Sequence, residues 1–249
     1  MADFTSVEYG VEWNSVAPVP GTECGFAALP ATKRVAVAFA DRMAKSGHSE
    51  AFRWGNANAW ASDFEHPAVN PTGNSLVAVD GVHLVYFAGH GAQEEAASFA
   101  SDHFGCRAYY ANMRLGVNKL RWLVLDLCGA VTSPVPESVV RVWSTPTSGD
   151  PAHPNQGPCM VCAFVDHGFP GINTERGADF AVAVSRGTPV GTAWLDSAFA
   201  RSGSDVNRPV AIACGATLDE ARFRRDRGTL AERDAGPVSS RFLASKWRR

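Results

Sequence analysis

Two stretches of the sequence decide the fold: Val82-His83-Leu84-Val85-Tyr86-Phe87-Ala88-Gly89-His90-Gly91 and Leu120-Arg121-Trp122-Leu123-Val124-Leu125-Asp126-Leu127-Cys128-Gly129-Ala130. Each is a near-continuous apolar run that ends in a polar residue beside glycine. Runs of this length are typical of strands buried on both faces, as in a parallel sheet covered by helices. The segment 94–118 between them is long enough for a crossover, and we expect a helix near its start, at Glu94 and Glu95.

The remaining segments complete an α/β pattern. An opening strand is expected within 4–13, and a helix over 31–45 with Thr32 as its N-cap. The segment 48–74 is expected to be an irregular loop rich in aromatic residues. The expected later elements are a long loop over 134–158, a buried strand over 159–165, helices over 176–185 and 190–201, and a last core strand over 209–214.

Length and composition narrow the classes of protein. The 249 residues suit one domain, 1–249, with an arginine-rich C-terminal tail from about residue 222 that we expect to be solvated. A net charge of -2 favours neither nucleic acid nor an anionic membrane as a partner. There is no long apolar run and no signal-peptide pattern over 1–13, so we expect a soluble, unexported protein. The six scattered cysteines suit reduced thiols, and therefore a cytoplasmic location.

His90 and Cys128 are the residues in which chemistry is expected. The carboxyl ends of parallel strands meet at one edge of a sheet, so neighbouring strands would bring the imidazole and the thiol together. A cysteine is mostly protonated at neutral pH and needs a base to become a nucleophile. The missing side chain of Gly91 would let a substrate backbone approach. The amides of Gly91 and Cys128 could stabilise an oxyanion, worth roughly 3 to 4 kcal/mol per donor. Taken separately, a buried structural cysteine and a glycine turn are the ordinary interpretations.

The two strand endings also carry a family resemblance. Val85 to Gly91 followed by Leu123 to Cys128 resembles the histidine and cysteine strands of the caspase-like (clan CD) cysteine peptidases, the superfamily of caspases, gingipains, clostripain, legumain and separase. It resembles more closely a bacterial family within that superfamily, known mainly as a domain of unknown function. Further segments fit that smaller family: Val11-Glu12-Trp13, Phe52-Arg53-Trp54-Gly55-Asn56 with Trp60 and Asp63, Leu120-Arg121-Trp122 and Thr192-Ala193-Trp194.

The resemblance implies a three-layer caspase-like sandwich, with about six mostly parallel strands flanked by helices, His90 as general base or acid, and Cys128 as nucleophile. The chain lacks the Gln-Ala-Cys-Arg-Gly arrangement of caspases, so their acidic specificity is not carried over. Asp126 shares strand parity with Cys128, and either orients the dyad or a substrate amine, or is satisfied by backbone or an arginine. We favour the second interpretation slightly. No third catalytic residue stands out.

Other candidates are weaker. Cys159 and Cys162 have the spacing of a half zinc site, but positions i and i+3 of a strand face opposite sides, so no metal is expected. Asp166 follows the next strand and either lines a specificity pocket or lies in a surface loop. Trp54 is a candidate for support or substrate binding, because aromatic loops often border a site. No cofactor is expected, since Gly89-His90-Gly91 lacks the third glycine of a dinucleotide fingerprint.

The sequence therefore predicts a cysteine peptidase that acts through a Cys128 acyl-enzyme on a peptide or protein substrate, with no nucleic acid or membrane partner. A transpeptidase, cyclase or acyltransferase would use the same dyad with a different acceptor. Two further hypotheses are a non-catalytic caspase-like binding scaffold and a thiol enzyme that acts on a small molecule.

Overall fold

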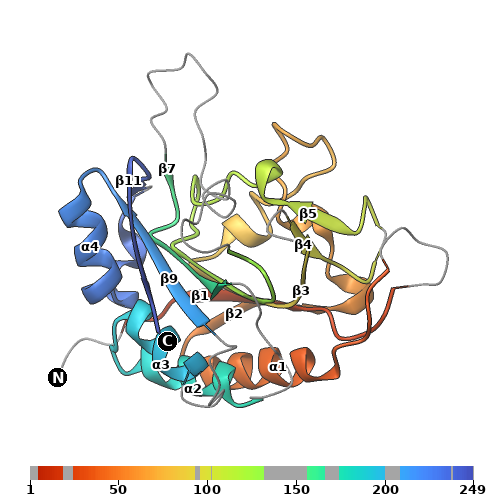
Figure 1. Ribbon diagram of the computed structural model, residues 1–249, viewed down its shortest axis with the longest axis horizontal. Helices are drawn as coiled ribbons and strands as arrows, with labels where there is room; N and C mark the ends of the chain where they lie inside the picture. Colours follow the sequence, from red (N-terminus) through yellow and green to blue (C-terminus); the bar gives the residue numbers. More distant parts are fainter. Residues whose placement is uncertain are drawn as a thin grey trace.

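The computed structural model is a three-layer α/β protein built on one central sheet (Figure 1). It describes residues 5–18, 25–92, 96–101, 103–131, 156–165, 174–199, 208–236 and 238–248. Along the main path of the sheet the strand order is β11-β9-β8-β6-β3-β1-β2. These strands are β1 (Glu8–Trp13), β2 (Ser49–Gly55), β3 (Leu84–Ala92), β6 (Trp122–Leu127), β8 (Met160–Val165), β9 (Arg208–Gly215) and β11 (Phe242–Trp247).

The pairings confirm the predicted α/β class. Strands β2, β1, β3, β6 and β8 run parallel to one another, whereas β9 and β11 pair antiparallel. All six residues of β6 are buried, as expected for a central strand covered on both faces. The segment 49–55, expected to be irregular, is instead the edge strand β2. There Phe52 and Trp54 pack inward, while the first three residues of the strand stay exposed.

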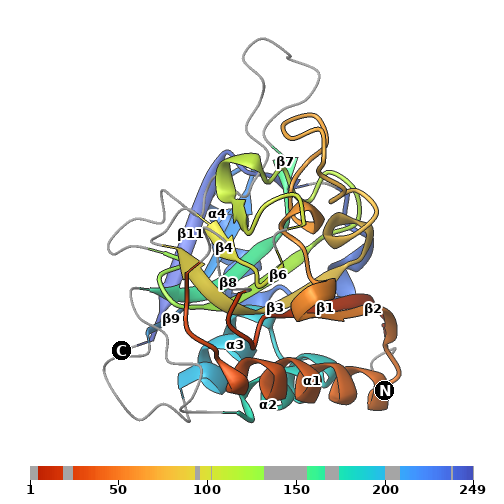
Figure 2. The ribbon, with the colours of Figure 1, turned by 90° about the vertical axis from the view of Figure 1, so that its right-hand side faces the viewer.

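One face of the sheet, here called the helix face, carries Tyr86, Ala88, Trp122 and Val124. Three helices pack against it: α1 (Pro30–Lys45), α2 (Arg176–Ser185) and α3 (Val190–Phe199). They lie together beneath the sheet in both views (Figures 1 and 2). The expected N-cap at Thr32 is wrong. Helix α1 begins at Pro30, and the Thr32 hydroxyl donates instead to the backbone oxygens of Leu29 and Asn14, each at 2.7 Å.

The opposite face, here called the loop face, carries Val85, Phe87, Leu123, Leu125 and Leu127. It is covered by short 3-10 helices and a small hairpin rather than by α-helices. These are η1 (Asn56–Asn58), η2 (Ala61–Asp63), η3 (Val79–Gly81), β4 (Ala96–Ser98), β5 (Arg107–Tyr109) and η4 (Tyr110–Asn112).

The helix expected near the start of the crossover is wrong in the described residues. Strand β4 follows the end of β3 almost at once and folds back on it, pairing His90 with Ser98 and Gly91 with Ala97. Ala97 and Phe99 are fully buried in the loop-face core. Glu94 and Glu95 themselves lie outside the described residues, and the residues that follow them form a strand that packs on this face.

The arginine-rich C-terminal region is part of the fold rather than an appended tail. It contains most of α4 (Leu218–Arg227), then η6 (Leu230–Asp234), β10 (Val238–Ser239) and β11, with β10 pairing with β7 (Gln156–Gly157). Two arginines hold this region by bonds to backbone oxygens. Arg224 donates to Cys214 and Arg225 donates to Ser245, both at 3.0 Å.

The cysteines do not all follow the expectation of reduced thiols. Cys128, Cys159, Cys162 and Cys214 are not in disulfides, but Cys106 is disulfide-bonded. Disulfides are rare in the cytosol, so this bond speaks against the cytoplasmic location, which stays a prediction. None of the helices in the described ranges is sufficiently long and apolar to cross a bilayer.

Candidate active site

His90 and Cys128 lie at the same edge of the sheet, where β3 and β6 end side by side. Strands β3 and β6 are parallel neighbours, with the register running from Leu84 opposite Trp122 to Gly89 opposite Leu127. His90 follows Gly89 in β3, and Cys128 follows Leu127 at the end of β6. Because side chains alternate along a strand, His90 falls on the helix face with Ala88. Cys128 lies in the turn directly after β6, opposite His90 when the register is extended by one residue. The structure thus brings together the two residues that the sequence singled out.

Gly91 shows how closely the two strand ends approach. A Cβ atom placed on Gly91 would lie 1.9 Å from the backbone oxygen of Cys128 and 2.6 Å from Cδ1 of Leu127. The space expected to admit a substrate backbone is therefore filled by the chain's own backbone, which corrects that part of the sequence interpretation. Only glycine permits this contact, and the contact locks His90 and Cys128 into adjacent positions.

The imidazole of His90 is held by the segment that precedes α1. Its Nε2 lies 2.6 Å from the backbone oxygen of Ala27, and its ring packs against Phe26 with centroids 4.6 Å apart. A carbonyl oxygen only accepts, so Nε2 carries the proton and Nδ1 is left as the basic nitrogen. Burial lowers the pKa of His90, and the bond to Ala27 only partly offsets this effect. The ring is therefore neutral near pH 7, as a general base must be.

The thiol of Cys128 differs in environment from two of the other cysteines. Cys128 is half-buried, whereas Cys159 and Cys162 are buried in the core. Burial raises the pKa of Cys159 to about 11 and that of Cys162 further still. Cys159 belongs to the loop-face core and Cys162 to the helix-face core, which confirms that their side chains lie on opposite faces of the sheet.

Asp126 is bound by an arginine, which is the interpretation that the sequence slightly favoured. Arg176 of α2 donates from Nε to Oδ2 at 2.8 Å and from Nη2 to Oδ1 at 2.6 Å. The Tyr86 hydroxyl donates to the same Oδ2 at 2.6 Å. Asp126 and Arg176 are each only 1% exposed. Burial works against the charge of Arg176, but the ion pair with Asp126 outweighs it and raises the pKa of the guanidinium. The pair therefore fastens α2 to β6 two residues before Cys128.

Asn14 is a buried junction that sequence reasoning missed. Its amide N–H donates to the oxygen of Ala88 at 2.9 Å, and its side chain donates to the oxygen of Ser98 at 3.3 Å. It also accepts the hydroxyl of Thr32 at its backbone oxygen. Asn14 thus ties β1, α1 and β4 together beside the end of β3. A single asparagine after an apolar strand gave no signal of this role.

Comparison with known proteins places the chain in a family. The family model described as Domain of unknown function (DUF6345) matches residues 14–226. The chain belongs to the DUF6345 family. The matched range contains His90, Cys128 and the Asp126–Arg176 ion pair of this member. No curated protein matches this chain significantly.

A solved structure to which this DUF6345 member is similar is the Arg specific cysteine proteinase gingipain R (RGPB). The sequence identity is 15% and the TM-score is 0.40, over 72% of this chain. The match covers 36% of the gingipain chain, so this chain spans little more than a third of that protein.

The remaining predicted site residues are not gathered around the dyad. Trp54 packs against the loop-face core, so the sheet separates it from His90 and Cys128 in this DUF6345 member. Trp60 and Asp63 line a cavity with Trp54. Asp166 lies outside the described residues. The amide N–H groups of Gly91 and Cys128 stay predicted oxyanion donors.

Proposed function

We propose that this chain is a cysteine peptidase of the caspase-like type, with Cys128 as nucleophile and His90 as general base and acid. One observation carries the proposal. His90 and Cys128 extend two parallel strands that are paired in register, and Gly91 packs against the backbone of Cys128. The bond from His90 Nε2 to Ala27 supports it further, because that bond leaves Nδ1 available to take the thiol proton.

The proposed reaction proceeds through an acyl-enzyme. His90 Nδ1 takes the proton of the Cys128 thiol, and the sulfur attacks the carbonyl carbon of a peptide bond. The backbone N–H groups of Gly91 and Cys128 stabilise the resulting oxyanion. The carbon–nitrogen bond breaks as His90 returns its proton to the leaving amine. Water then gives a proton to His90 and attacks the thioester, which releases a carboxylic acid and restores the thiol.

The substrate class follows from the same chemistry. The acyl-enzyme is proposed to form on a peptide or an exposed protein loop, with no cofactor or metal involved. The proposal holds for the cytoplasm and for an oxidising compartment alike, since Cys128 is not in a disulfide.

The decisive experiment measures the reactivity of the Cys128 thiol. Wild type, Cys128→Ala and His90→Ala are treated briefly with substoichiometric iodoacetamide at about pH 6.5, where an ordinary thiol with a pKa of about 8.5 is nearly all protonated. Intact-mass spectrometry counts the labels. His66→Ala is the matched control. The imidazole of His66 accepts a hydrogen bond from the amide N–H of Ala68, two residues away, and so contacts its own loop.

We expect fast single labelling in wild type and His66→Ala, and its loss in both dyad variants. Slow labelling spread over several cysteines and unaffected by His90→Ala would overturn the activated dyad. A peptide library then separates the reactions by product mass. A cleaved peptide supports hydrolysis, and a joined peptide assigns the acyl-enzyme to a transpeptidase or cyclase. An unreactive thiol with no product supports the binding scaffold.

A further inference from the structure

The cavity lined by Trp54, Trp60 and Asp63 lies on the loop face of the sheet. It has a volume of about 450 Å³ and is lined by Trp54, Asn58, Trp60, Asp63 and Asn74. All five residues belong to the aromatic segment 48–74, which the proposed peptidase chemistry does not use. The lining comes from β2, η1, η2 and the turn that follows, so one stretch of chain, 54–74, builds the site.

Asp63 lines the cavity, and a second buried carboxyl group, that of Glu12, lies close enough to Asp63 for the two to interact electrostatically. Asp63 is 1% exposed and accepts the Trp60 amide N–H at 2.9 Å and a bond from Asn74. Glu12 of β1 is fully buried, and neither of its carboxyl oxygens has a hydrogen-bond partner in the described chain. Burial, and then the nearby charge of Asp63, raise the pKa of Glu12. The side-chain oxygen of Asn74 is also buried and, within the described residues, unpartnered.

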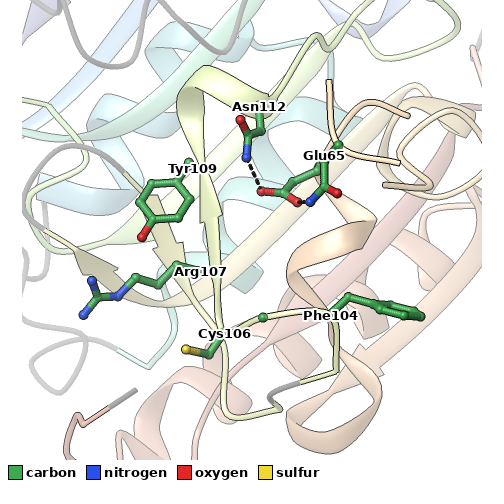
Figure 3. Close-up of a pocket in the computed structure, with 8 residues that line it drawn as sticks. Glu65, Phe104, Cys106, Arg107, Tyr109 and Asn112 are labelled. Carbon is green, nitrogen blue, oxygen red and sulfur yellow. Dashed lines mark hydrogen bonds between the residues drawn. The ribbon is translucent and has the colours of Figure 1, made fainter. Parts of the chain in front are cut away.

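Another cavity, here called the neighbouring cavity because Glu65 in its lining follows Asp63 by two residues, shows how a buried acid is hydrogen-bonded elsewhere in this protein. Figure 3 shows Asn112 facing Glu65 there, and its amide donates to Oε1 at 2.8 Å while Asn70 donates to Oε2. Glu65 therefore has donors on both oxygens. Glu12 has none, and within the described ranges no lysine or arginine pairs with Glu12 or Asp63. Burial also raises the pKa of Asp63, while the bonds from Trp60 and Asn74 and the nearby charge of His103 oppose that rise. The cavity therefore presents a carboxyl group that has no lysine or arginine partner among the described residues.

The aromatic walls are fixed. Trp54 stacks on Phe52 with ring centroids 4.3 Å apart, and Trp60 packs on His103 at 4.2 Å. The indole N–H of Trp60 donates to the oxygen of Ala57 at 2.7 Å. Rigid indole faces attract cations through the ring quadrupole, and a carboxylate beside them strengthens that preference.

We propose that this cavity binds the alkylguanidinium or alkylammonium group of an organic ligand. Asp63 is the counter-ion, the side-chain oxygen of Asn74 accepts an N–H, and Trp54 and Trp60 cover the alkyl chain and the cationic head. A bare metal ion fits this site less well. Asp63 is the only carboxylate in the lining, and the described residues contain no cluster of three or more metal-ligating side chains. The proposal stands independently of the dyad.

The test is calorimetric titration of the full chain with butylguanidinium and butylammonium chloride. Butylurea is the uncharged control of nearly the same shape as butylguanidinium, and methyl glucoside tests a neutral polar ligand. The variants are Asp63→Asn and Trp60→Leu, and Glu65→Gln is the matched control in the neighbouring cavity. Thermal unfolding of each variant establishes that it is folded.

We expect a cation to bind wild type and Glu65→Gln, with affinity reduced at least about tenfold for butylurea and for both cavity variants, as loss of one ionic contact would give. Equal binding of butylurea or methyl glucoside would overturn the proposal, as would absence of cation binding up to about 50 mM. If Asp63→Asn fails to fold, the comparison of butylguanidinium with butylurea still decides the question.

Discussion

The ion pair between Asp126 and Arg176 offers the sharpest test of how the candidate site is held. Asp126→Asn keeps the shape of the side chain and removes its charge. The guanidinium of Arg176 would then remain buried, at 1% exposure, without a counter-ion. The charged acceptor is lost for both hydrogen bonds of the bidentate Arg176 interaction and for the bond from Tyr86.

Breaking one partner of such a pair costs about 3–5 kcal/mol, because the remaining charge is desolvated and unpaired. In a domain of this size each kcal/mol lowers the melting temperature by about 2–4 °C, so we expect a fall of roughly 6–20 °C. Replacing the whole group should behave differently. The triple variant Asp126→Leu, Arg176→Met, Tyr86→Phe removes every charge and donor together, and we expect its stability to lie within about 1–2 kcal/mol of wild type.

Urea unfolding followed by circular dichroism measures both free energies, with iodoacetamide labelling of Cys128 as a second readout. Asp126→Asn should also slow the labelling, because the pair anchors β6 two residues before the thiol. A stability loss of less than about 1 kcal/mol would refute the reasoning, since that is the size of an exposed pair. A triple variant as unstable as Asp126→Asn would refute it equally.

Three further predictions concern other contacts. Gly91→Ala should destabilise the protein by about 1–3 kcal/mol or more and abolish fast labelling of Cys128, whereas Gly25→Ala, which has open space for a Cβ, should do neither; melting temperatures and intact mass check this. Burial raises the pKa of Glu12 in the folded protein above 4.5. The stability that the protonated carboxyl group contributes is therefore complete below pH 4.5 and is lost as pH rises through the folded pKa. Glu12→Gln should therefore gain stability relative to wild type as pH rises above 4.5 in urea titrations, and a constant difference would contradict the buried acid. Cys159, whose pKa is raised to about 11, should stay unlabelled in the folded protein at neutral pH, and peptide mapping that finds it alkylated as fast as Cys128 would show that β8 opens.

Much of the sheet could be predicted from the sequence because its strands are buried on both faces. The apolar runs around Val85 and Val124 have no other stable environment in a chain of this size, and their polar ends then mark one edge of the sheet. Strand β2 was missed because it is an edge strand with only one apolar side. Its alternation of Phe52 and Trp54 is too short to separate from a loop rich in aromatic residues.

The supporting contacts of the dyad could not be predicted, for a different reason. The group that holds His90 is the backbone oxygen of Ala27, and any residue type supplies the same oxygen. Arg176 reaches Asp126 from a helix fifty positions away, and nothing local in either segment specifies that partner. Likewise β4 is a strand only because β3 extends beyond β6 and leaves Gly91 and its neighbours to pair.

Two sets of contacts hold His90 and Cys128, the proposed reactive groups, at the edge of the sheet. On one side, the missing side chain of Gly91 lets β3 and the end of β6 approach to backbone contact. On the other side, Arg176 fixes Asp126 and thereby the strand that delivers Cys128. His90 is set between these constraints by Ala27. The cavity around Asp63 lies on the loop face, where neither Asp63 nor Glu12 pairs with a lysine or arginine among the described residues. The proposed cation site and the proposed nucleophile are therefore separate sites.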